Sequence, residues 1–178
     1  MPTLYYALGI SADGYINGPD GTFVWAVPDD ELHRFHNQQA AETGVQLLGR
    51  RLYEQMLPWE LQDWTSPTEA EFASAWRGLD KVVFSTTLDA VQGHARLATR
   101  SLEEEVAALP DTLVGVGGAG LAAACAQRGL IDEYRLFINP VVVGGGTRYF
   151  PPGVHIDLEL IETRTFGSKV VYLRYRRV

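Results

Sequence analysis

A glycine cluster in the last third of the chain could bind phosphate. The stretch "VGVGGAGL", residues 114–121, follows aliphatic residues and spells G-x-G-x-x-G from Gly115 to Gly120. In this pattern glycine lets the backbone approach a phosphate at a helix N-terminus. A standard Rossmann domain also has an acid about 20 residues later, at the end of the next strand. Asp132 and Glu133 come earlier, at the start of that strand and not at its end, so we expect a dinucleotide site in a different fold.

Two other apolar runs end in residues that could bind phosphate. They are Gly49, Arg50 and Arg51 in "LLGRRLYE" and Ser85, Thr86 and Thr87 in "VFSTTL". Arginine contributes charge and paired hydrogen-bond donors, and serine and threonine hydroxyls add neutral donors. Ligands of a parallel sheet bind at the carboxyl ends of its strands. Each junction alone could be a simple turn, but the three together indicate a long, multiply charged ligand such as a dinucleotide.

Apolar runs and helix signals alternate along most of the chain. We expect strands at 3–10, 45–49, 81–86, 95–99, 112–116 and 133–144, and a hairpin in 157–178 around Phe166, Gly167 and Ser168. We expect helices at 28–42, 50–57 ending before Pro58, 66–78 and 101–109 with capping boxes, and 119–129. Such alternation predicts a single α/β domain over residues 1–178, with helices on both faces of a mostly parallel sheet of about eight strands and an antiparallel C-terminal hairpin. The arginine-rich end, 172–178, is expected to be an edge strand.

Composition narrows the class of protein. The chain has 178 residues and a net charge of -7, which disfavours a nucleic-acid partner. The lone Cys125 excludes an internal disulfide, and His33 and His36 lack an acid spaced to complete a metal site, so we expect no metal. The start, "MPTLYYALGI", does not resemble a signal peptide, and no apolar run is long enough to span a membrane. These features predict a cytoplasmic protein.

Five stretches resemble, in sequence and order, those of the RibD C-terminal family: "SADGYINGPDG", "LLGRRLYE", "VVFSTTL", "VGVGGAGL" and "GLIDEYRLFINPVVVGGGTRYF". The likeness extends from Tyr5 to Tyr175. It implies the dihydrofolate reductase-like fold, with three α/β/α layers, and an NADPH-dependent reductase that is usually a homodimer. The best-known family activity is reduction of 5-amino-6-(5-phosphoribosylamino)uracil in riboflavin synthesis. A pterin-type reductase, or a nucleotide-binding module without turnover, stays open as an alternative.

The resemblance also implies roles for the three junctions. The pyrophosphate would lie on Gly117, Gly118, Ala119, Gly120 and Leu121, the phosphates and adenosine side on Gly49, Arg50 and Arg51, and the 2′-phosphate near Ser85, Thr86 and Thr87. Residues 7–16 would border the nicotinamide. The family commonly has threonine where this chain has Leu52 and arginine where it has Thr86. These departures leave NADH open beside NADPH.

Hydride transfer also needs a source of a proton. Asp13, after the first predicted strand, is the candidate acid and would touch the substrate, although Asp-Gly also favours a plain turn. Asp30 and Glu31 resemble the acid of dihydrofolate reductases in position, but acids are common at a helix N-terminus. Trp25 could stack on a heterocycle or belong to the core. Water is the alternative proton source.

Overall fold

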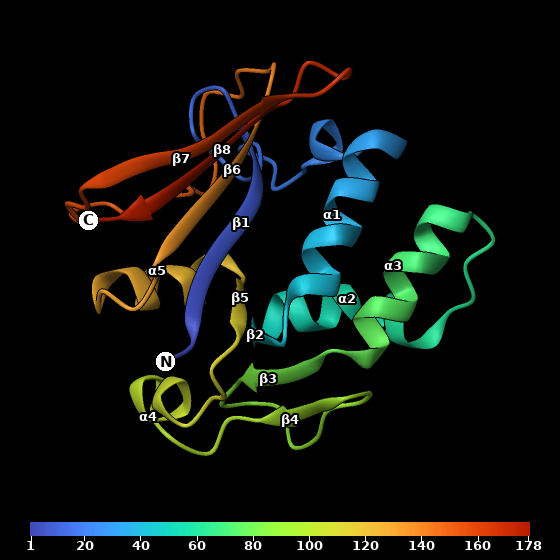
Figure 1. Ribbon diagram of the computed structural model, residues 1–178, viewed down its shortest axis with the longest axis vertical. Coiled ribbons are helices and arrows are strands. Elements are labelled where there is room, and N and C mark those ends of the chain that lie inside the picture. Colours follow the sequence, from blue (N-terminus) through green and yellow to red (C-terminus); the bar gives the residue numbers. More distant parts are fainter.

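The computed structural model describes all residues, 1–178. Its strands are β1 (Thr3–Ser11), β2 (Val45–Gly49), β3 (Asp80–Phe84), β4 (Ala95–Leu97), β5 (Leu113–Gly117), β6 (Glu133–Asn139), β7 (Leu158–Thr165) and β8 (Val171–Arg177). They form one eight-stranded sheet with the order β4-β3-β2-β5-β1-β6-β8-β7 (Figure 1). Strands β1 to β6 pair in parallel, and β8 pairs antiparallel with β6 and β7. The predicted fold class is confirmed.

Helices cover both faces of this sheet. They are α1 (Asp30–Glu42), α2 (Arg50–Leu61), α3 (Pro67–Gly78), α4 (Leu102–Ala107) and α5 (Ala119–Gln127), with a short 3-10 helix η1 (Val24–Ala26). Successive side chains of a strand point to opposite faces. Leu47 of β2 accordingly packs in the core cluster that contains Cys125 of α5, whereas Leu48 packs with Trp76 of α3. Helices α4 and α5 thus lie on one face and α1, α2 and α3 on the other (Figure 1).

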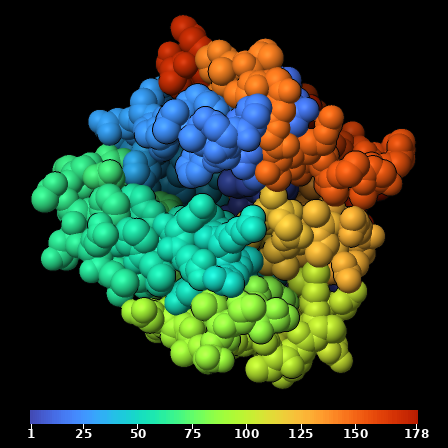
Figure 2. All heavy atoms as spheres, turned by 180° about the vertical axis from the view of Figure 1, so that it is seen from behind, coloured from blue at the N-terminus to red at the C-terminus, as the bar shows by residue number.

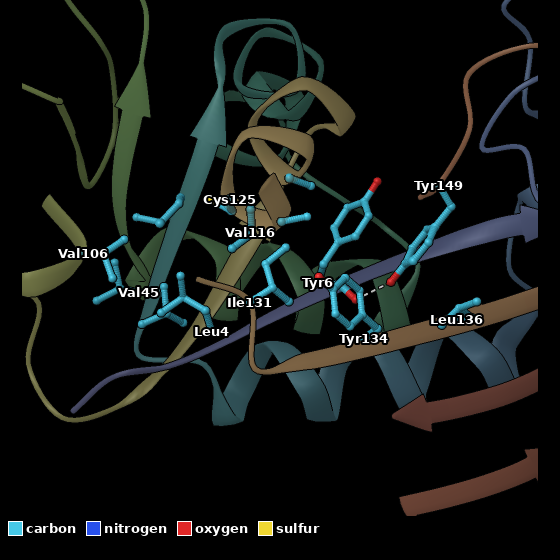
Figure 3. Close-up of a cluster of buried hydrophobic side chains, with 14 of the residues drawn as sticks. Leu4, Tyr6, Val45, Val106, Val116, Cys125, Ile131, Tyr134, Leu136 and Tyr149 are labelled. Carbon is cyan, nitrogen blue, oxygen red and sulfur yellow. Dashed lines mark hydrogen bonds between the residues drawn. The ribbon is translucent and has the colours of Figure 1, made fainter. Parts of the chain in front are cut away.

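The segment after β6 returns over the α5 face and is anchored there by Tyr149. The Tyr149 ring stacks on Tyr6 with centroids 4.3 Å apart, and its hydroxyl donates to the Tyr6 carbonyl at 2.7 Å. Figure 3 shows these two rings and Tyr134 facing one another in the core. A buried hydroxyl needs a partner, and this one finds it in the backbone of the central strand. The bond fixes where residues 141–148 cross the carboxyl end of the sheet.

Helix α2 does not end before Pro58, as the sequence predicted, but runs on to Leu61. A proline inside a helix removes one hydrogen bond and strains the preceding turn. Here the last turn is held by tertiary contacts: Trp59 stacks on Trp64 at 3.9 Å, and Glu60 pairs with the buried Lys81 at 2.8 Å. These contacts offset the local penalty, which a local sequence signal cannot show.

Two other local predictions were wrong. The arginine-rich β8 is not the edge strand, because it lies between β6 and β7. Its arginines form ion pairs, and Arg174 binds the largely buried Glu133 at 2.6 Å, whereas Arg176 stays exposed. The Ser66 side chain makes no capping hydrogen bond to α3, whereas both hydrogen bonds of the Ser101–Glu104 box are present at α4.

Candidate functional site

A cavity of about 1070 Å³ opens at the carboxyl ends of β1, β2 and β5. Four parts of the chain line it: the end of β1 with the loop over residues 16–26, the first turns of α2 and of α5, and Thr147. Figure 2 shows this hollow where the segments near residues 20, 50, 120 and 147 meet, with β1 at its floor. Its volume lies just above the usual range for sites that bind small molecules, about 300–1,000 Å³.

Two helix N-termini lie side by side at this cavity. Gly49 precedes α2 and Gly118 precedes α5, and neither residue gives its helix a side-chain cap. The backbones are close, because a Cβ added to Gly118 would lie 3.7 Å from the Gly49 nitrogen. The first-turn N–H groups of both helices lack intrahelical partners and carry partial positive charge. This arrangement is chemically suited to an anion with two adjacent charged groups.

Gly118, directly before α5, requires glycine, and Gly117 before it is closely packed. Gly118 has a φ of +96°, which side chains with a Cβ rarely adopt, and a Cβ on Gly117 would lie 2.6 Å from Leu52 Cδ2. Gly120 differs, because a Cβ added there meets nothing within 4 Å. Its empty surroundings face the cavity and mark where a ligand could approach α5.

Arg50 links the junction after β2 with the junction after β3. Its Nη1 donates to Thr87 Oγ1 at 2.8 Å, and its Nε binds Glu54 at 3.0 Å. Ser85 Oγ accepts from the backbone N–H groups of Thr87 and Leu88, which holds this turn in shape. The structure therefore brings the residues after β2, β3 and β5 together, with Ser85–Thr87 reached through Arg50 and outside the cavity wall.

Arg51 is the one charged side chain of the cavity wall without an ion pair. It is exposed, and the other two charged side chains of the wall, Arg50 and Glu54, neutralise each other. Leu52 follows it and packs its side chain toward Gly117. Arg51 is thus free to meet an anionic ligand, and Leu52 adds no hydroxyl to the site.

Asp13 lies outside the cavity wall. Its carboxylate accepts hydrogen bonds from the backbone N–H of Val143 at 3.2 Å and of Gly144 at 2.8 Å. Hydrogen bonding from Ser11, and then from these two amides, lowers the pKa of Asp13 below its ordinary value. The carboxyl is therefore ionised near neutral pH, and it ties the end of β1 to the segment after β6.

The structure does not bring Asp30, Glu31 or Trp25 into the cavity wall. Asp30 is 4.0 Å from Arg34 on its own helix. Glu31 binds Arg164 at 3.2 Å and accepts from the Gly167 N–H at 2.9 Å, so it fastens α1 to the β7–β8 turn. The Trp25 indole N–H is buried without a partner. The nearby Phe23 and Ala26 line the cavity, but Trp25 does not.

Asn17, Thr147 and Phe23 line the cavity and were missed by sequence reasoning. Asn17 Oδ1 accepts from the Thr147 N–H at 2.8 Å, and its Nδ2 donates to Thr147 Oγ1 at 3.2 Å. Asn-Gly and the Gly144–Gly146 run each predict only a turn. Nothing in either local pattern indicates that they meet across 130 residues of chain.

His33 and His36 are packed against aromatic rings. The His36 ring lies 4.5 Å from Phe137, and burial lowers the pKa of His36 to about 4. The His33 ring lies 5.9 Å from Phe72. No group of three or more His, Cys, Asp or Glu side chains is arranged to hold a metal ion.

None of the helices combines the length and the apolar character that crossing a membrane requires.

The sheet order, the layers and the glycine junctions define a dihydrofolate reductase-like fold. Dihydrofolate reductase from Enterococcus faecalis, complexed with NADP(H) and RAB-propyl, matches with a TM-score of 0.67 and 16% identity over 98% of this chain and 96% of its own. The model of the RibD C-terminal domain matches residues 2–172. The chain belongs to the RibD C-terminal domain family.

One relative of similar length supports this membership, and two solved structures share the fold. The uncharacterized protein YyaP of Bacillus subtilis (strain 168) is 32% identical over 175 residues, which cover 94% of this chain and 91% of that protein. A "putative riboflavin biosynthesis protein" from Shewanella sp. PV-4 matches with a TM-score of 0.77 and 20% identity over 99% of both chains. The diaminohydroxyphosphoribosylaminopyrimidine deaminase/5-amino-6-(5-phosphoribosylamino)uracil reductase of Thermotoga maritima gives 0.70 and 15%, and the match covers 99% of this chain but only 57% of that one.

Proposed function

We propose that this chain is an NADPH-dependent reductase of the RibD C-terminal type. The observation that carries the proposal is the pair of uncapped helix N-termini, at Gly49 and Gly118, that open into one cavity beside the unpaired Arg51. Family membership and the match to a reductase complexed with NADP(H) support it. The residues present fit a dinucleotide, because its pyrophosphate needs two adjacent anion sites with room for close backbone approach.

The chain's own residues would hold the cofactor along one wall of the cavity. Residues Gly117–Leu121 and Gly49 would bind the pyrophosphate, and Arg50 and Arg51 with Ser85–Thr87 would meet the adenosine side and the 2′-phosphate. The reduced nicotinamide, when bound, supplies the hydride. Glu54 is the only carboxyl in the wall and is paired with Arg50, so we propose that water supplies the proton.

The substrate and the assembly are finer proposals. Family membership makes 5-amino-6-(5-phosphoribosylamino)uracil one candidate substrate, and a dihydropterin or an oxidised pterin is another. A homodimer is the proposed assembly, which light scattering behind a sizing column would test.

A module that binds the dinucleotide without turnover is the alternative function. The observation that favours it is the lack of a free carboxyl in the cavity wall, since such a group could have supplied the proton.

Binding is the direct test of the proposal. Titration with NADPH and with NADH, followed by the fluorescence of the four tryptophans, should give saturable changes. Gly120→Asp should weaken NADPH binding at least about tenfold, because a carboxylate a few Å from the pyrophosphate repels it by more than about 1.4 kcal/mol. Its folding should be unharmed, since the new Cβ meets nothing within 4 Å and an acid favours a helix N-terminus.

Gly120→Asn is the matched control, with the same shape and no charge. It should bind NADPH several-fold more tightly than Gly120→Asp. Absence of saturable binding by either dinucleotide to the native chain would overturn the proposed function. Saturable binding, together with no cofactor oxidation over both candidate substrates, would favour the module without turnover.

A further inference from the structure

The two ends of the cavity differ in charge. All charged side chains of its wall, Arg50, Arg51 and Glu54, belong to the first turns of α2. The opposite end is lined by four apolar side chains and by two that are polar and uncharged: Leu8, Ile16, Phe23, Ala26, Asn17 and Thr147. If α2 and α5 hold the dinucleotide, as proposed above, this uncharged end is the space left for the substrate.

The polar groups of the uncharged end are partly used already. Asn17 and Thr147 bind each other through both the Asn17 oxygen and its nitrogen. The remaining Asn17 Nδ2 hydrogen and the Thr147 hydroxyl can each make one further hydrogen bond. This end therefore offers one or two neutral hydrogen bonds, which suit a carbonyl or a ring nitrogen.

The charged side chains of neighbouring residues lie outside the wall of the uncharged end. Asp13 binds the amides of Val143 and Gly144, and Asp20 binds the N–H and hydroxyl of Thr22. The Arg148 guanidinium lies over the Tyr15 ring, 5.3 Å from its centre, and not in the cavity wall. A phosphate or carboxylate against this end would lose water without meeting a cation in the cavity wall, which is costly. A protonated ring would likewise meet no carboxylate in this part of the wall.

Phe23 makes this end suitable for a flat ligand. Its side chain lines the cavity and is still 53% exposed, and the neighbouring Val24 and Val27 are exposed as well. Large apolar side chains left exposed at the mouth of a cavity gain free energy when a ligand covers them. An aromatic ring adds the preference for stacking on another planar ring.

We propose that the substrate of this enzyme is a flat, uncharged and mainly apolar carbonyl or imine compound without phosphate. The inference rests on the proposed function, because it assigns the charged end of the cavity to the dinucleotide. If it is correct, phosphoribosyl compounds are not the substrates of this chain. Phe23 and Ile16 would contact the ring system, and Asn17 or Thr147 would donate to its oxygen or nitrogen.

The test measures ligand binding to the chain saturated with NADP⁺. Saturation-transfer NMR compares 1-naphthol, which is planar and uncharged at neutral pH, with 1-naphthyl phosphate, the same ring with a charged ester. We expect 1-naphthol to bind at least about tenfold more tightly. Equal or tighter binding of the phosphate, or no saturable binding of 1-naphthol, would overturn the proposal. Failure of NADP⁺ itself to bind would instead overturn the proposed function.

Thr147→Lys adds a cation to the uncharged end, and Thr147→Met is its matched control of similar length. The lysine variant should gain affinity for 1-naphthyl phosphate by about tenfold, which corresponds to 1.4 kcal/mol for one new charge-assisted contact. Its affinity for 1-naphthol should not rise, and the methionine variant should show no gain for the phosphate. A gain by both variants would mean that charge is not what excludes the phosphate.

Discussion

Asp13 is better placed to position a loop than to donate a proton. Its carboxylate binds two backbone amides after β6, and its lowered pKa keeps it ionised. Asp13→Asn retains one acceptor oxygen, so we expect turnover to fall less than about tenfold and the acid side of the pH–rate profile to stay in place. Removal of a true proton donor costs about a hundredfold to ten-thousandfold. A loss of that size, with a changed profile, would restore the acid role proposed from the sequence.

Arg51 should set how strongly the chain prefers NADPH, which carries a 2′-phosphate, over NADH. It is exposed at the second position of α2 and has no ion pair, whereas Arg50 is held by Glu54 and Thr87. Because a hydrogen bond to a charged group contributes about 1.5–3 kcal/mol, Arg51→Gln should lower NADPH affinity at least about tenfold. The loss for NADH should be smaller if Arg51 meets the 2′-phosphate.

Isothermal titration of both dinucleotides measures this difference. Arg100→Gln is the control, since Arg100 is also exposed and also without an ion pair but lies before α4. Equal losses for NADPH and NADH would place Arg51 on the pyrophosphate that both share. No loss for either would remove Arg51 from the site.

Helix α4 is held at its start by a carboxylate that the sequence did not single out. Glu105 is fully buried, binds Arg96 at 2.6 Å and accepts from the amides of Thr99 and Arg100. These contacts, led by the Arg96 hydrogen bond, lower the pKa of Glu105 to about 2 from an ordinary value of 4.5. Since the folded pKa is the lower one, the stabilisation is complete above pH 4.5 and is lost as the pH falls toward 2.

Glu105→Gln should therefore reduce the free energy of unfolding by about 2 kcal/mol at neutral pH, and by progressively less below pH 4.5. Urea unfolding of both proteins at neutral pH and at several acid values measures the difference. Glu103→Gln removes an exposed pair with Arg128 and should cost no more than about 1 kcal/mol. A Glu105→Gln loss that does not shrink in acid would show that packing, not charge, is responsible.

Elements that carry their own signal were predicted from the sequence, and those decided by distant contacts were not. The capping box at Ser101 and the glycine after β5 act within a few residues, so both were found. Pro58 stays inside α2 because Trp59 and Glu60 have partners outside the helix. The same limit applies to the site. The glycine turns that line the cavity were predicted from local patterns, but the Asn17–Thr147 contact depends on how the whole chain returns to β1.

The sheet has a parallel part, which carries the candidate site, and an antiparallel part formed by β6, β8 and β7. Helix α1 packs on the antiparallel part through a second core cluster, in which Phe35 contacts Phe137, Phe166 and Tyr172. Glu31 adds a polar link from α1 to the hairpin turn. The loop from β1 to α1 contains Phe23 and passes over the cavity, so loss of this packing should disturb the site as well as the fold.

His36 lies in this α1 layer and should make the stability of the whole chain depend on pH. Burial, with the nearby His33 charge, lowers the pKa of His36 to about 4 from an ordinary value of 6.5. The unfolded chain therefore binds a proton first as the pH falls, and the free energy of unfolding should drop between pH 6.5 and 4 by up to about 3 kcal/mol. His36→Gln should flatten this slope, whereas His155→Gln, at an exposed loop position, should retain it. Unfolding measured above pH 4.5 avoids the titration of Glu105, and an unchanged slope in His36→Gln would mean that another group senses the acid.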